Sequence, residues 1–81
     1  MEQTEKRDTI ELHQIGERMK ELRIAKGYTN YENFAFENNI PRAQYGRYEK
    51  GANMTMASFL KALKGLEVSP EEFFGGIEKK V

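Results

Sequence analysis

Residues 34–51 have the sequence Phe-Ala-Phe-Glu-Asn-Asn-Ile-Pro-Arg-Ala-Gln-Tyr-Gly-Arg-Tyr-Glu-Lys-Gly. This stretch predicts two short helices joined by a tight turn. Asn38 and Asn39 are suited to ending the first helix, because asparagine adopts the left-handed backbone conformation more readily than other non-glycine residues. Pro41 then fixes a φ angle that is compatible with the start of a second helix, which we expect to run to about Lys50. The chain is therefore organised around one pair of helices.

This helical pair has an apolar inner side and a polar outer side. The residues with the spacing to meet between the helices are Phe34, Ala35, Ile40, Tyr45 and Tyr48. If the two tyrosines point inward, helical geometry places a different set on the opposite side of the second helix. That outer set is Arg42, Ala43, Gly46 and Arg47, with Gln44 on the flank. The polar outer side makes the second helix the candidate functional surface.

A further helix is predicted before the pair. The segment Asp8-Thr9-Ile10-Glu11 has the spacing of a capping box, so we expect this helix to start near Ile10. Apolar residues then recur at three- and four-residue steps, and Gly27 provides a stop after about Lys26. Thr29 or Asn30 would cap the first helix of the pair, which we expect over about residues 30–38.

Two amphipathic helices are predicted after the pair. Thr55 is suited to capping a helix whose apolar face comprises Met56, Phe59, Leu60, Leu63 and Leu66. The segment Ser69-Pro70-Glu71-Glu72 combines a capping serine, a proline at the first helical position and a returning glutamate, so a short fifth helix is expected there. We therefore expect one domain over residues 10–78, with the helical pair at about 30–50. Residues 1–9 would form a flexible polar extension and residues 79–81 a tail.

The composition excludes several classes of protein. The 81 residues include no cysteine, so the fold has to rest on apolar packing without disulfides or thiolate metal sites. The single histidine, His13, lies among charged neighbours and is expected to be a solvated residue, so neither a metal nor a cofactor is expected. The sequence shows no secretory signal pattern and no long apolar run, which predicts a cytoplasmic protein that does not span a membrane. No constellation typical of an enzyme is present.

Charge is unevenly distributed although the formal net charge is zero. Residues 41–64 contain five cations and one anion, which gives a net charge of +4. Residues 27–40 contain two anions, and residues 65–81 contain four anions and two cations, so each segment has a net charge of −2. The one basic segment therefore contains the candidate functional helix.

These residues together resemble the lambda-repressor-like, Cro/CI-type (XRE-family) helix-turn-helix DNA-binding domains. The resemblance covers residues 15–74. The matching segments are Ile15–Arg23, Phe34-Ala35, Tyr45–Gly51, Phe59–Leu66 and Val68–Phe73. The resemblance implies an all-α, compact five-helix domain that binds double-stranded DNA and regulates transcription, as a repressor.

The resemblance also assigns contacts to DNA. The second helix of the pair would enter the major groove as the recognition helix, with base contacts from Arg42, Ala43, Gln44 and Arg47. The start of the first helix and the loop after the second would contact phosphates through Thr29, Asn30, Tyr31, Lys50 and Asn53. A solvated helix face without a ligand is the alternative for the base-contacting set. A half-buried structural role is the alternative for Tyr31.

Two residues match a structural ion pair of the family, and one glycine calls for an explanation. Arg23 and Glu49 stand where the family has a partly buried pair that links the first helix to the end of the recognition helix. Gly46 lies inside a helix, where glycine costs about 1 kcal/mol relative to alanine. We expect it to allow DNA or a neighbouring helix to approach closely, the alternative being a tolerated instability.

The sequence departs from the family pattern in the turn. Asn39 replaces the customary glycine, and Pro41 replaces the usual serine or threonine cap, which leaves the recognition helix without a side-chain cap. Asn38 stands where an apolar residue is expected, and Phe36 is the candidate to replace that contact.

A homodimer is expected on the basis of the C-terminal segment. Its apolar side chains exceed what a terminal two-turn helix needs for one core: Phe73, Phe74, Ile77 and Val81. Complete packing of these side chains within one chain is the alternative. The competing function is a protein-interaction module on the same fold, either antitoxin-like or an adaptor with a protein partner, which the neutral net charge and the acidic tail favour.

Overall fold

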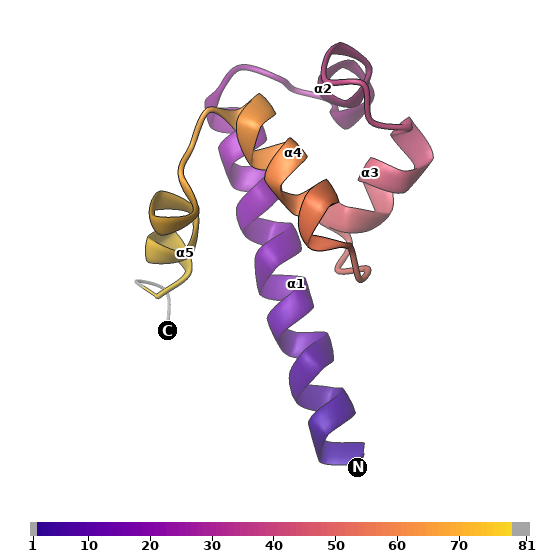
Figure 1. The fold of residues 1–81 in the computed structure, drawn as a ribbon, viewed down its shortest axis with the longest axis vertical. Coiled ribbons are helices and arrows are strands. Elements are labelled where there is room, and N and C mark those ends of the chain that lie inside the picture. The colour runs from indigo at the N-terminus through magenta and orange to yellow at the C-terminus, as the bar shows by residue number, and fades with distance from the viewer. Residues whose placement is uncertain (1, 79–81) are drawn as a thin grey trace.

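The computed structural model describes the backbone of residues 2–78 and the side chains of residues 9–77. Over this part of the chain the elements are five α-helices, with no strand: α1 (Glu2–Ala25), α2 (Tyr31–Glu37), α3 (Arg42–Glu49), α4 (Met56–Leu66) and α5 (Pro70–Glu78). Helix α1 runs along the length of the molecule, with α3 and α5 on opposite sides of it (Figure 1). The predicted all-α, five-helix fold is confirmed. None of the described helices is long and apolar enough to cross a bilayer.

Helix α1 begins at Glu2, well before the start that we expected near Ile10, so that prediction was wrong. Asp8 and Thr9 lie inside a continuous helix and not at its cap. The sequence over residues 2–9 contains no glycine or proline and is rich in glutamate, glutamine, lysine and arginine, all of which favour helix. These helix-favouring residues extend α1 toward the N-terminus, beyond the capping box predicted at residues 8–11. Residue 1 and the predicted tail, residues 79–81, lie outside the described residues.

The core draws on α1 through α5. Its buried members are Met19, Phe34, Ala35, Ile40, Tyr45, Tyr48, Phe59, Ala62, Leu63, Leu66 and Phe73. All five residues that we predicted between the two central helices are among them. The rings of Phe34 and Tyr45 lie 5.0 Å apart between their centroids, so α2 and α3 are joined by aromatic packing.

Two residues assigned to the apolar face of α4 lie instead at the surface. Met56 is 68% exposed and Leu60 is 48% exposed. The buried stripe of α4 is formed by Phe59, Ala62, Leu63 and Leu66. Each residue turns a helix by about 100°, which places Met56 and Leu60 at the edge of that stripe and not at its centre.

The predicted substitute for the missing apolar contact at Asn38 was also wrong. Phe36 is 81% exposed, because it projects from the side of α2 that faces away from the core. Asn38 itself occupies the space between α2 and α4. Its Nδ2 donates to the Phe34 carbonyl at 2.8 Å, and its amide lies where a side chain at Gly65 of α4 would have to be.

Helix α5 is held against α1 by Arg18. The Arg18 guanidinium donates through Nε to the Phe73 carbonyl and through Nη2 to the Glu72 carbonyl, each at 2.9 Å. A Cβ atom at Gly76 would collide with this guanidinium. The glycine therefore allows an arginine side chain to lie flat against a helix backbone.

Candidate nucleic-acid interface

The turn between α2 and α3 has the backbone conformation that its asparagines predicted. Asn30 caps α2, its Oδ1 accepting a hydrogen bond from the Asn33 amide at 2.9 Å. Asn39 has a φ of 59°, in the left-handed region, and Ile40 follows as a buried plug whose amide donates to the Ala35 carbonyl at 2.9 Å. These bonds set the angle at which α3 leaves α2.

Helix α3 starts without a side-chain cap. Pro41 occupies the capping position, where it makes no side-chain hydrogen bond, although its carbonyl accepts from the Tyr45 amide at 2.9 Å. The φ of −55° at Pro41 suits the first turn of a helix. Pro41 therefore begins this helix through its backbone alone, and its fixed φ sets the direction of the residues that follow.

The outer side of α3 presents polar and cationic groups to solvent. Arg42, Ala43 and Arg47 are exposed. Gln44 is half-buried on the flank, and its Nε2 donates to the Tyr48 hydroxyl one turn further along the helix. The structure therefore brings the four predicted base-contacting residues onto one short helix, and three of them are exposed.

Gly46 does not belong to this outer side, which corrects its predicted position. It is buried under Tyr31 of α2, and a Cβ atom at Gly46 would lie only 2.8 Å from Cε1 of that ring. Gly46 follows the inward-pointing Tyr45 by one residue, a rotation of about 100° toward α2. The close approach at this glycine is made by a neighbouring helix.

Tyr31 contributes to the packing between the helices. Its ring centroid lies 6.3 Å from that of Tyr45, and the residue is half-buried. The remaining residues predicted to contact phosphates are exposed on either side of the helical pair in the chain: Thr29 and Asn30 before α2, and Lys50 and Asn53 after α3. Asn53 Oδ1 accepts from the Met54 amide at 2.9 Å, which orders the loop after α3.

A buried ion pair fixes the end of α3 to the end of α1. Arg23, 4% exposed, donates through Nε to Glu49 Oε2 at 2.7 Å and through Nη2 to Glu49 Oε1 at 3.1 Å. Its Nη1 donates to the Tyr28 carbonyl at 2.6 Å. The hydrogen bond to Glu49 raises the pKa of Arg23 above its ordinary value. Both charged groups are satisfied away from the outer side of α3.

Comparison with known proteins agrees with this geometry. The sequence profile of the helix-turn-helix family matches residues 19–73, which is more than half of the chain. This chain belongs to the helix-turn-helix family. The resemblance drawn from the sequence is confirmed, and the family and fold are those of DNA-binding transcriptional regulators. Comparison with curated protein sequences gives no match.

Solved structures similar to this helix-turn-helix protein include two restriction-modification controller proteins. The wild-type controller C.Esp1396I is 32% identical with a TM-score of 0.74, over 84% of this chain and 88% of that chain. The controller C.AhdI from Aeromonas hydrophila is 34% identical with a TM-score of 0.72, over 79% of this chain and 97% of that chain. Each similarity extends over almost the whole of the solved chain.

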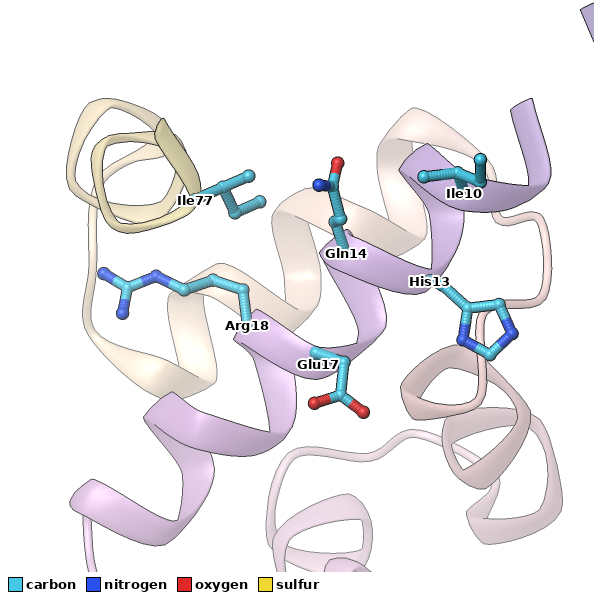
Figure 2. Close-up of a pocket in the computed structure, with 6 residues that line it drawn as sticks. All are labelled: Ile10, His13, Gln14, Glu17, Arg18 and Ile77. Atoms are coloured by element: carbon cyan, nitrogen blue, oxygen red, sulfur yellow. The ribbon is translucent and has the colours of Figure 1, made fainter. Parts of the chain in front are cut away.

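A hollow of about 370 Å³ lies elsewhere on this helix-turn-helix protein, between α1 and α5. It is lined by Ile10, His13, Gln14, Glu17, Arg18 and Ile77 (Figure 2). In this view Arg18 reaches toward α5 and Ile77 projects toward α1, whereas His13 points to the other side of α1. No group of three potential metal ligands occurs among the described residues. The outer side of α3 remains the surface best suited to binding.

The sequence reasoning missed two features of this surface. It did not foresee that Tyr48 would orient Gln44, although the spacing of four residues on one helix is the signal for such a pair. It also placed Gly46 on the wrong side. An aromatic residue at the start of the preceding helix, Tyr31, was the available signal that a ring would cover that glycine.

Proposed function

We propose that this protein is a sequence-specific regulator of transcription, a repressor that binds double-stranded DNA as a homodimer with α3 in the major groove. The observation that supports this most directly is the outer side of α3. Arg42, Ala43 and Arg47 are exposed on it, while Tyr45 and Tyr48 anchor the opposite side in the core. A rigid helix that presents such residues fits the groove of B-form DNA, which admits an α-helix.

Each exposed residue has a suitable partner on a base edge. The guanidinium groups of Arg42 and Arg47 can each donate two hydrogen bonds to guanine O6 and N7, and the Ala43 methyl can contact a thymine methyl. Gln44 keeps one amide hydrogen and its carbonyl oxygen after donating to Tyr48, because a side-chain amide has two donor hydrogens. Those two groups are what an adenine edge requires, so Tyr48 orients Gln44 without using up its recognition capacity.

Positioning on the duplex would come from the groups beside α3. Lys50 follows the helix directly and Asn53 lies in the loop after it, while Thr29 and Asn30 precede α2. The segment 41–64, with five cations and one anion, gives this region a net charge of +4 that attracts phosphates. Tyr31, which is half-buried, would contribute through the part of the residue that remains accessible.

The similarity to two restriction-modification controllers supports a specific regulatory role. Because the identity is 32% and 34% over most of the chain, we infer that this protein is also a controller of a restriction-modification system. We choose the DNA upstream of its own gene as the first duplex to test.

Titration of that duplex, followed by fluorescence anisotropy at several salt concentrations, tests the proposal. Arg42→Ala and Arg47→Ala should each weaken binding about tenfold to a hundredfold, since a bidentate base contact contributes about 1–3 kcal/mol. Lys20→Ala removes one exposed positive charge from α1 and is the matched control, expected to bind almost as the unchanged protein does. Absence of salt-sensitive binding to any duplex would overturn the proposal. A protein that co-purifies in equal amount, with Arg47→Ala leaving its activity intact, would instead favour the protein-interaction module.

A further inference from the structure

One histidine of α1 lies beside the loop that follows α3. His13 is exposed, and in Figure 2 its ring points away from α5. A Cβ atom at Gly51 would lie 3.2 Å from both Cδ2 and Cγ of that ring. The imidazole therefore lies against the loop of residues 50–55, which joins α3 to α4.

The backbone of this loop holds the contact in place. Gly51 has a φ of 99°, in the left-handed region that favours glycine, and its amide donates to the Tyr48 carbonyl at 3.1 Å. The Ala52 amide donates to the Arg47 carbonyl at 2.9 Å. Because these bonds tie the loop to the last turn of α3, His13 has a defined position relative to that helix.

The imidazole of His13 is available to a ligand. Neither of its ring nitrogens makes a hydrogen bond to any part of the chain that the structure describes. The nearby charged groups are Glu17, which lines the same hollow one turn along α1, and Lys50, which lies in the loop. At the end of α3, the Glu49 carboxylate is already paired with Arg23. One neighbour of each sign remains, so an added anion would decide which form of the ring is favoured.

The position of His13 matches that of the proposed phosphate contacts. Lys50 directly precedes Gly51 and Asn53 follows it by two residues, and both are exposed. Under the proposed function these two side chains contact the DNA backbone. An imidazolium beside them offers two N–H donors and a positive charge, which are the groups that bind a phosphate oxygen.

We propose that His13 contacts a DNA phosphate beside Lys50 and Asn53, and that its imidazole takes up a proton from the solvent when this contact forms. The inference rests on the proposed DNA-binding function, and it adds a residue of α1 to the interface. A phosphate is anionic, so it favours the charged form of the ring over the neutral form. Affinity should therefore rise as the pH falls, by at most about tenfold per pH unit for one proton.

Fluorescence anisotropy titrations of the full chain at pH 6 and pH 8, at one fixed ionic strength, test this contact. The duplex is the DNA upstream of its own gene. Histidine is the side chain that ordinarily changes charge in this interval, and the chain contains only one. The unchanged protein should bind several-fold more tightly at pH 6 than at pH 8. Calorimetric titration in two buffers of different ionisation enthalpy should show the accompanying proton uptake.

Substitutions at residue 13 separate the charge of the ring from its packing. His13→Gln is polar and uncharged at both pH values, so it should bind at pH 6 about as weakly as the unchanged protein does at pH 8. His13→Lys is charged at both pH values, so it should bind tightly at both. Thermal unfolding of each variant at both pH values shows whether the chain is still folded.

A swapped pair of residues provides the matched control. The double variant His13→Gln/Gln14→His keeps the composition of the chain and moves the imidazole about 100° around α1, to the side where Gln14 projects beside α5 (Figure 2). It should lose the pH dependence as His13→Gln does.

The outcomes distinguish this proposal from the proposed function. Equal affinity of the unchanged protein at pH 6 and pH 8 overturns the His13 contact and leaves the DNA-binding function standing. The same holds if His13→Gln or the swapped variant keeps the full pH dependence. Absence of binding to any duplex at either pH overturns both.

Discussion

Arg23 and Glu49 are the clearest case in which one residue pair fixes the placement of a helix, α3. Their two hydrogen bonds join the last turns of α1 and α3 inside the protein, where exposed fractions of 4% and 7% leave little access to water. A pair of this kind stabilises through the penalty that follows when one partner is lost, since the other charge is then buried alone. The pair has a structural role, and under the proposed function it would affect DNA binding only through the orientation of α3.

Glu49→Ala should lower the free energy of unfolding by about 3–5 kcal/mol, because it leaves the Arg23 guanidinium buried without its counter-charge. Urea denaturation followed by circular dichroism measures the change. Lys26→Ala is the control, since it removes a solvent-exposed pair with Glu67 and should alter stability far less. An unchanged midpoint for Glu49→Ala would show that the pair does not stabilise the fold.

Single residues also show where sequence reasoning was sufficient. Asn39 was assigned to the left-handed turn because its residue type favours that conformation, and its φ of 59° agrees. Gly46 was recognised as a position in need of an explanation, but its neighbour was not identified. The backbone preference of a residue can be predicted from its type. The contact between the Tyr31 ring and Gly46 cannot, because it depends on how α2 packs against α3.

Among the elements, α5 combines core burial with one specific contact from α1. Phe73 is fully buried, whereas Phe74 is 40% exposed, so only one of the two adjacent phenylalanines of α5 belongs to the core. Arg18 holds the backbone of this helix through two carbonyl groups. The two adjacent glycines of α5 differ sharply in their surroundings. Gly76 lies against the Arg18 guanidinium, and the position of a Cβ at Gly75 is open.

Gly76→Ala should therefore displace Arg18 and loosen α5, whereas Gly75→Ala should be neutral or stabilising by up to about 1 kcal/mol from helix propensity. Hydrogen exchange of the α5 amides distinguishes the two variants. Faster exchange is expected in Gly76→Ala and unchanged or slower exchange in Gly75→Ala. Equal exchange rates in both variants would mean that the Arg18 contact does not hold the helix.

The helices themselves were predictable to different degrees. The cap at Thr55 and the start of α5 at Pro70 follow from short-range signals that act within one turn. The start of α1 was misplaced because a capping pattern and a run of good helix formers compete, and the longer run prevailed. The exposure of Met56 and Leu60 was not predictable from periodicity, since both lie at the edge of the α4 stripe and the position of α5 decides whether an edge is covered.

On the scale of the whole molecule, the zero net charge is the sum of one basic segment and the acidic segments beside it. Cations are concentrated in residues 41–64, and the segments on either side of it carry net negative charge. Long-range attraction to DNA should therefore be modest, with affinity depending on contacts made close to α3.

Lys50→Ala tests this view of the electrostatics. It should reduce the slope of log affinity against log salt concentration by about 0.9, the amount expected for one phosphate contact on B-form DNA. It should weaken binding about equally for preferred and non-preferred sequences, because a phosphate contact carries no sequence information. An unaltered slope would remove Lys50 from the interface, and a change of sequence preference would move it to the base-contacting set.

The two sides of α3 have a consequence for how such a regulator can diverge. Tyr45 and Tyr48 hold the helix in the core, whereas Arg42, Ala43 and Arg47 are exposed. Under the proposed function, substitutions at these three exposed residues should alter which bases are preferred and leave the stability of the fold almost unchanged. Two copies of one ancestral gene in the same cell could therefore evolve different DNA sites without any change in the core.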